Sequence, residues 1–147
     1  MNPVFPSHDG ASTPVMEDPL VELEVRRPRV AMYSHDAQGL GHIRRNLLIS
    51  RILGSQADSA VVLLLSGVRE ASAFSMGAGV DCVTLPALEK NGTEYDARHL
   101  SLPVMDVVEM RRSAIRGAVD GFRPDVMIVD KLPRGVHDEL VPTLELL

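Results

Sequence analysis

The sequence predicts an α/β protein with a Rossmann-like, doubly wound parallel sheet. Short apolar runs of strand length alternate along the chain with longer segments whose apolar residues recur at helical spacing. This alternation is typical of parallel strands that are joined by helices packed on the sheet. The 147 residues are 45% hydrophobic, which is enough for one domain with a real core.

The first predicted unit is a strand, a glycine turn and a helix. Val30–Tyr33 is a short apolar run bounded by polar residues, which is typical of a strand buried on both faces. Gly39 and Gly41 allow a tight turn after it. A helix is expected from about His42, because apolar residues follow at spacings near 3.6, namely Ile43, Leu47, Leu48 and Ile52.

Three more strands and a long helix follow. The strands are expected at Ala60–Leu65, Asp81–Leu85 and Asp125–Val129, each of which is a short, mostly apolar segment. A continuous apolar stripe predicts a helix over Leu102–Phe122, with Ser101 as its N-cap. Three arginines beside this stripe are expected on a solvated face: Arg111, Arg112 and Arg116.

Two segments lie between or after these elements. Pro86–Leu100 is too polar for a core element and is predicted to be a long functional loop. A last helix is expected to begin near Gly135 or His137 and to run to the C-terminus. The chain stops inside its apolar segment Leu140–Leu147, without a cap or a following strand, and doubly wound domains usually carry more strands. The sequence therefore predicts a truncated domain.

Bulk properties limit the function classes. Residues 1–28 contain five scattered prolines and little periodicity, so we expect a flexible tail before a domain at 29–147, and no secretory signal.

A net charge of −5 argues against nucleic-acid binding. The longest strongly apolar stretch, Ala60–Leu65, is far shorter than the roughly 20 residues of a membrane span. A single cysteine, Cys82, favours a reducing cytoplasm.

The glycine turn lacks the features of two common phosphate-binding motifs. A dinucleotide fingerprint requires a third glycine, where this chain has Arg44, and an acidic residue after the second strand, where it has Ser66 and Gly67. A P-loop is excluded because no Gly-Lys-Ser/Thr follows. The free amides and the dipole of the helix still favour an anion, and Arg44 and Arg45 add positive charge. Alternatively, the glycines only join a strand to a helix.

His42 is a candidate general base. It stands at a helix N-terminus and at the carboxyl end of a parallel strand, where ligands bind in open α/β sheets. The helix dipole disfavours a charged ring there, so the neutral imidazole can accept a proton near neutral pH. The alternative is a histidine that only caps the helix.

Asp130 is the expected partner of His42. It closes the fourth strand, and in the common doubly wound order the first and fourth strands are neighbours. A carboxylate that accepts the second ring proton would orient the imidazole and stabilise its charged form. The alternative is an aspartate that caps the next turn.

Other polar residues are expected at the same edge. His35 and Asp36 either contact substrate or form a polar turn, and we favour a supporting role. His99 and His137 are expected in loops nearby. No spacing among the histidines and Cys82 resembles a metal site, so no metal is expected.

Two segments resemble a known family. Tyr33–Arg45, Y-S-H-D-A-Q-G-L-G-H-I-R-R, is similar to a motif of bacterial predicted glycosyltransferases with a GT-B, MurG-like fold, and Phe122–Asp130, F-R-P-D-V-M-I-V-D, also resembles them. The resemblance covers Arg29 to Leu147. It implies the N-terminal half of a GT-B fold, which shapes the acceptor site, whereas the absent C-terminal domain binds the nucleotide-sugar donor.

The resemblance also implies roles for single residues. Gly39, Gly41 and His42 match the glycine-rich loop and the histidine often assigned as base, and Asp130 matches an aspartate that pairs with it in some relatives. The implied reaction transfers a sugar from a nucleotide-sugar to an acceptor hydroxyl and needs no further cofactor. The isolated chain is expected to be inactive without a donor-binding domain, fused or separate.

Two alternatives come from other classes. A stand-alone Rossmann-like module could use the corner Gly39–Arg45 to hold an anionic ligand or a partner. An inactive, truncated remnant would also fit the abrupt end. Sugar, nucleotide, acceptor and oligomeric state are not encoded in any pattern that we identify.

Overall fold

The computed structural model of the protein describes residues 26–55 and 59–147, so residues 1–25 of the predicted tail lie outside the described residues. Within the described part, four strands form a parallel sheet in the spatial order β3-β2-β1-β6. Their bounds are Arg29–Ser34 for β1, Val61–Ser66 for β2, Val80–Thr84 for β3 and Val126–Val129 for β6. The α/β class and the parallel sheet are confirmed, and the arrangement is compatible with a Rossmann-like fold. Each strand differs from its predicted bounds by at most one residue at either end.

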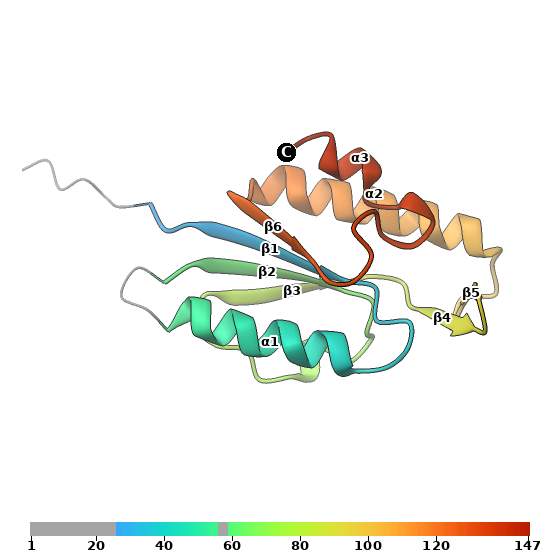
Figure 1. Cartoon of the computed structure of the whole chain (residues 1–147), viewed down its shortest axis with the longest axis horizontal. Helices are drawn as coiled ribbons and strands as arrows, with labels where there is room; N and C mark the ends of the chain where they lie inside the picture. The colour runs from blue at the N-terminus through green and yellow to red at the C-terminus, as the bar shows by residue number, and fades with distance from the viewer. Residues whose placement is uncertain (1–25, 56–58) are drawn as a thin grey trace, which may run out of the picture.

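Helices cover both faces of the sheet (Figure 1). On one face, β1 and β2 pack against α1, Gly41–Gly54, through a cluster that includes Met32, Leu64, Ile43 and Leu47. On the other face, they pack against α2, Val104–Phe122, through Tyr33, Leu65, Ile115 and Val119. Successive strand residues point to opposite faces, so a strand covered on both sides must be apolar at nearly every position.

The buried face of α1 differs from the predicted stripe. Leu48 and Ile52 are 60% and 64% exposed, although the other two predicted residues are buried. Asn46 and Ser50 take the buried positions instead. Each residue advances a helix by about 100°, so the sheet covers only one narrow stripe, and Leu48 lies beyond its margin. The Ser50 hydroxyl donates to the Leu47 carbonyl at 2.9 Å, which satisfies it without water.

α2 has the predicted apolar stripe but a different start. Val104 is its first residue, and Pro103 occupies the N-cap position without a side-chain hydrogen bond. Ser101 is therefore not the cap, and that prediction is wrong. Pro103 has an extended backbone, and its carbonyl accepts from the amide of Val107 at 3.3 Å, so the proline sets the start. No helix among the described residues is long and apolar enough to cross a membrane.

The segment Pro86–Leu100 contains a β-hairpin, so the prediction of an irregular loop is wrong. β4, Leu88–Asn91, pairs antiparallel with β5, Glu94–Ala97. The chain reverses at Gly92, whose φ of +64° suits glycine. Leu88 is buried against the start of α2, whereas most of the other hairpin side chains are polar and face solvent. Only one side of the hairpin packs on the protein, so few of its residues need to be apolar. A mostly polar sequence therefore gave no sign of a strand pair.

The C-terminal segment is not the single helix that we expected. A 3₁₀ turn at Val136–Asp138 precedes the short helix α3, Val141–Leu144. His137 and Asp138 adopt positive φ values of 47° and 59°, which interrupt helical geometry. The kink lets Val136 pack beneath the hairpin while Leu140 enters the cluster around Tyr33.

Candidate functional site

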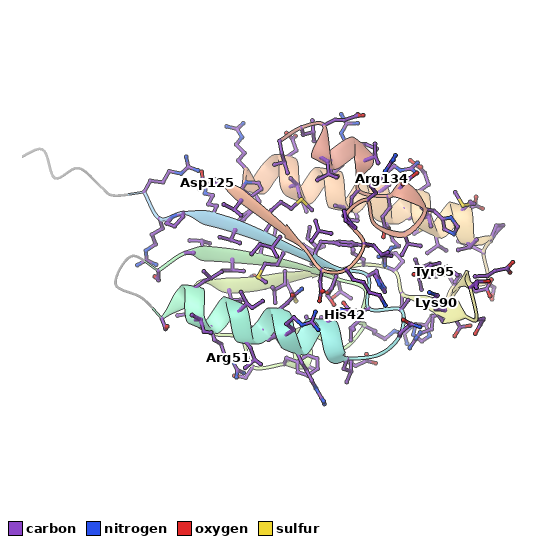
Figure 2. All side chains as sticks on the ribbon, in the orientation of Figure 1. His42, Arg51, Lys90, Tyr95, Asp125 and Arg134 are labelled. Atoms are coloured by element: carbon purple, nitrogen blue, oxygen red, sulfur yellow. The ribbon has the colours of Figure 1, made fainter. Side chains whose placement is uncertain are left out.

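The carboxyl ends of β1 and β6 lie side by side and bring two distant segments together. Tyr33 and Val129 are paired in the parallel register, and the Asp130 amide donates to the Tyr33 carbonyl at 3.0 Å. The loop after β1 leads into α1, whose second residue is His42 (Figure 2). The strand order thus places the start of α1 next to the end of β6.

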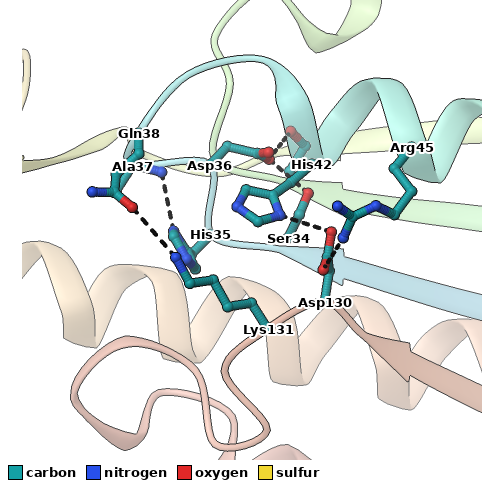
Figure 3. A network of polar contacts seen from close by, with 10 residues as sticks. Ser34, His35, Asp36, Ala37, Gln38, His42, Arg45, Asp130 and Lys131 are labelled. Atoms are coloured by element: carbon teal, nitrogen blue, oxygen red, sulfur yellow. Dashed lines mark hydrogen bonds and ion pairs between the residues drawn. The ribbon is translucent and has the colours of Figure 1, made fainter.

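His42 and Asp130 are in direct contact, as predicted from the strand order. Nδ1 of His42 lies 2.8 Å from Oδ2 of Asp130, and Arg45 donates to Oδ1 of the same carboxylate at 2.8 Å (Figure 3). His42 and Arg45 are three residues apart on α1 and therefore share one face. The His42 and Asp130 side chains are only 18% and 11% exposed. The carboxylate is held on both oxygens from one helix.

This contact determines which ring nitrogen is available for chemistry. An ionised carboxylate only accepts hydrogen bonds, so Nδ1 of His42 must carry a proton. In the neutral ring the lone pair then belongs to Nε2, which has no protein partner among the described residues. The arrangement can accept a proton at Nε2 and stabilise the resulting positive ring through Asp130.

The two arginines at the start of α1 have different surroundings. Both were expected to bind substrate or phosphate, which stays a prediction. Arg45 donates from Nη1 to Asp130. Arg44 is exposed and has no side-chain hydrogen bond or ion pair within the described residues. Of the pair, Arg44 is the one left available to an anion.

His35 lies next to His42 but is buried. Its ring centroid is 5.3 Å from that of His42, and Nδ1 accepts from the Ala37 amide at 3.1 Å. Nε2 therefore carries the hydrogen of the neutral ring, and it has no partner in the described structure. Burial, reinforced by His42, lowers the pKa of His35. His35 is a neutral neighbour of His42 rather than a second charge.

Asp36 ties the ends of two strands together. Its Oδ2 accepts from the hydroxyls of Ser34, at the end of β1, and Ser66, at the end of β2, at 2.6 and 2.7 Å. The Ser66 oxygen accepts in turn from the Val68 amide. Asp36 reaches this position with a φ of +53°. This geometry fits the supporting role that we favoured, although Oδ1 has no hydrogen-bond partner within the described part of the chain.

The glycines of the turn leave open space. Gly39 has a φ of +114°, and a Cβ atom added at Gly39 or Gly41 would meet no atom within 4 Å. Gly67 is the opposite case, because an added Cβ would lie 2.2 Å from the His35 carbonyl oxygen. The close approach of Gly67 to the loop after β1 was missed by sequence reasoning. Its one signal is a glycine directly after a buried strand.

A pocket of about 130 Å³ opens beside the turn. Its lining includes Asp36, Gly39 and Gly67. Arg69 and Arg98, from the loop after β2 and the end of the hairpin, also line it. Sequence reasoning missed Arg69 and placed Arg98 only within the predicted functional loop Pro86–Leu100, without a role of its own. Arg69 could have been found as the first charge after the second strand, whereas Arg98 arrives through a hairpin that was not predicted.

A buried ion pair lies beneath this edge. Arg111 and Glu139 both have fully buried side chains, and Nε of Arg111 donates to Glu139 at 2.6 Å. The Tyr33 hydroxyl donates to the same carboxylate. Burial, together with Glu139, raises the pKa of Tyr33 above its ordinary value. The expectation that Arg111 is solvated is wrong, because a buried carboxylate 28 residues away compensates its charge.

The described residues contain no group of three His, Cys, Asp or Glu side chains that could hold a metal ion. Fold and site together define an α/β protein with a His–Asp pair at the carboxyl edge of a parallel sheet. Neither a scan against protein-family models, nor a search of curated proteins, nor a search of solved structures found a match for this chain.

Proposed function

We propose that this chain is the acceptor-side domain of a glycosyltransferase that uses a nucleotide-sugar donor. One observation carries the proposal: the 2.8 Å contact between His42 and Asp130, which are 88 residues apart and meet at the carboxyl edge of the sheet. Ligands of open α/β sheets bind at this edge. The sequence resemblance to GT-B glycosyltransferases at Tyr33–Arg45 supports the same reading.

In the proposed reaction, His42 is the general base. The acceptor hydroxyl oxygen attacks the anomeric carbon of the donor sugar and forms the glycosidic bond. The bond between that carbon and the diphosphate oxygen breaks, and its electron pair leaves with the nucleoside diphosphate. The hydroxyl proton moves to Nε2 of His42, and Asp130 stabilises the positive ring that results.

Other residues have positioning roles in this proposal. Arg45 holds the second carboxylate oxygen of Asp130 and so fixes the orientation that His42 needs. The open space over Gly39 and Gly41 leaves room for the reacting groups. A donor-binding domain, fused or separate, would hold the nucleotide and face this edge. We expect the isolated chain to bind the donor poorly.

Sugar transfer by the natural polypeptide that carries this chain tests the proposal. Its intact mass, detected with an antibody in its own cells, shows whether a donor domain is fused to it. The purified product is incubated with a panel of nucleotide-sugars and a metabolite extract, and products are identified by mass spectrometry.

The decisive comparison uses three variants. We expect His42→Gln to lower transfer by at least about 100-fold, because general-base catalysis contributes that much or more. Asp130→Asn should also lower it, whereas Arg116→Gln, on an exposed position of α2, should not. Full transfer by His42→Gln contradicts the assigned base. Transfer by the isolated chain contradicts the need for a donor domain.

A second candidate is a stand-alone module that binds an anionic ligand. The observation in its favour is the pocket beside Gly39, which Arg69 and Arg98 line. In that case the natural product would lack a donor domain and would bind a ligand without any transfer.

A further inference from the structure

The pocket beside Gly39 is separate from the His42–Asp130 contact. Its lining comes from the segments after the carboxyl ends of β1 and β2, from Ala87 between β3 and β4, and from Arg98 and His99 after β5. Neither His42 nor Asp130 lines it. The charged residues of this pocket therefore have no role in the proposed proton transfer.

One buried acceptor in this lining is unused. Asp36 is only 3% exposed and lines the pocket. Its Oδ2 is satisfied by two serine hydroxyls, but Oδ1 has no hydrogen-bond partner among residues 26–55 and 59–147. Buried carboxylate oxygens are normally paired, because losing water without gaining a donor is costly. No donor among the described residues reaches Oδ1, which is enclosed in this structure, so a ligand hydroxyl complements it only when the turn that carries Asp36 shifts to admit it.

The pocket also carries positive charge. Arg69 is exposed and has no side-chain hydrogen bond or ion pair within the part of the chain that the structure describes. Arg98 donates from Nη2 to the Ala37 carbonyl at 3.1 Å, which holds its guanidinium near the turn. Glu70 adds a carboxylate to the same lining. With both signs present, the pocket favours a ligand with two different ends rather than any anion.

We propose that this pocket binds a small acidic sugar, a molecule that carries hydroxyl groups and one carboxylate or phosphate. A hydroxyl donates to Oδ1 of Asp36, and the anionic group pairs with Arg69 and Arg98, which can contact its oxygens in a forked geometry. The proposal rests on the proposed function in one respect: such a ligand is then the acceptor.

A neighbouring cavity has room for the rest of an acceptor that is larger than one sugar. A second cavity of about 300 Å³ shares Arg69, Ala87 and His99 with the pocket. Its remaining lining is mostly apolar and consists of Thr84, Leu85, Pro86 and Leu100. An acidic sugar in the pocket would have its outward end in this cavity.

Binding of simple probes tests the proposal without any donor or transfer. Glucuronate and glucose 6-phosphate carry both groups, glucose carries only hydroxyls, and inorganic phosphate carries only charge. Amide chemical shifts of the ¹⁵N-labelled protein give the location and the Kd of each. We expect both acidic sugars to shift the amides of Gly39, Gly67 and Ala87, and to bind about tenfold tighter than glucose or phosphate.

Two variants identify the contacts. Arg69→Gln should weaken both acidic sugars about tenfold, whereas Arg116→Gln, an exposed arginine on α2, should not. Asp36→Asn has opposite effects on different probes. It removes a negative charge and so should leave phosphate unchanged or tighter. Its amide oxygen is held by the Ser34 and Ser66 hydroxyls, so an NH₂ donor replaces Oδ1, can no longer accept from the sugar hydroxyl, and should weaken glucuronate.

Several results would overturn the proposal: glucose binding as tightly as glucuronate, unchanged glucuronate binding in Arg69→Gln, or no shift at the pocket with any acidic sugar. If Asp36→Asn tightens glucuronate as it does phosphate, no hydroxyl reaches Oδ1, and the assigned contact is wrong. Each of these failures leaves the transfer assay with His42→Gln standing, so the two proposals fail separately.

Discussion

Oδ2 of Asp130 accepts a hydrogen bond from Nδ1 of His42 across 2.8 Å, and Arg45 occupies the other oxygen of the same carboxylate. The carboxylate therefore cannot turn away from the ring without losing the arginine as well. Because the hydrogen of the neutral ring is held on Nδ1, the lone pair is held on Nε2.

The first prediction concerns this tautomer. In the wild-type protein, ¹⁵N chemical shifts of His42 should show a neutral ring protonated at Nδ1. Asp130→Asn presents a side-chain NH₂ group that can donate to Nδ1 of His42. The ring hydrogen should then move to Nε2, which would no longer have a lone pair to accept a proton. Asp125→Asn, at the opposite end of β6, is the matched control and should leave the His42 signals unchanged. A ring protonated at Nε2 in the wild type would contradict the assignment.

The second prediction concerns the buried pair of Arg111 and Glu139. Removing one partner leaves the other charge buried without compensation, so Arg111→Met should lower the free energy of unfolding by about 3–5 kcal/mol. Urea unfolding measures the change. Glu139→Gln should cost a similar amount, and the double variant should cost less than the sum of the two.

Arg116→Gln serves as the control for this pair. It lies on the same helix but is exposed, so its effect should stay within about 0.5 kcal/mol. Equal effects at the two arginines would show that Arg111 is not buried with Glu139 in solution.

The third prediction contrasts two glycines. An added Cβ at Gly67 would lie 2.2 Å from the His35 carbonyl oxygen, and backbone atoms there cannot move freely. Gly67→Ala should therefore destabilise the fold by about 3 kcal/mol or more. At Gly117, within α2, an added Cβ meets nothing within 4 Å, so Gly117→Ala should stabilise the protein by about 1 kcal/mol. Thermal unfolding of both variants checks the opposite signs.

The fourth prediction is a pH dependence that originates at His35. Burial lowers its pKa in the folded state below the ordinary value of 6.5. Between those two pKa values the unfolded chain binds more protons than the folded one, so the free energy of unfolding should rise with pH there. Above about pH 7 both states are neutral at this residue and its effect ends.

His35→Asn isolates this effect. Asparagine can still accept from the Ala37 amide, but it does not titrate. Below pH 6.5, the ordinary pKa of histidine, the free energy of unfolding of the variant should therefore depend less on pH than that of the wild type. Urea unfolding at several pH values measures the slope, with His99→Asn as the exposed control. A slope that is identical in wild type and His35→Asn would be inconsistent with a buried, neutral His35.

Several features could be predicted because they follow from local pattern and topology rules. The strands are short apolar runs, and their bounds follow from composition to within one residue. The approach of His42 to Asp130 follows from the strand order, which brings the first and fourth sheet strands together. Their contact was therefore predictable, whereas their catalytic role stays a prediction.

Other features depend on partners that no local pattern contains. Arg111 looks like a surface residue until Glu139 compensates its charge. Leu48 looks like a core residue until the sheet covers a different stripe of α1. Gly92 and Thr93 form the two-residue loop between the paired Asn91 and Glu94, and Gly92 was a turn signal that the polar hairpin strands hid.

The α/β class, the four parallel strands, the two main helices and the approach of His42 to Asp130 were all predictable from the amino-acid sequence. These depend on hydrophobic period and chain order, which are read along the chain. The buried polar groups, the oxygen of Asp36 that lacks a donor among the described residues, and the arginines that line the pocket became visible only in the folded protein. Burial of a polar group is set by partners distant in sequence, because a charge is tolerated inside only where another segment compensates it.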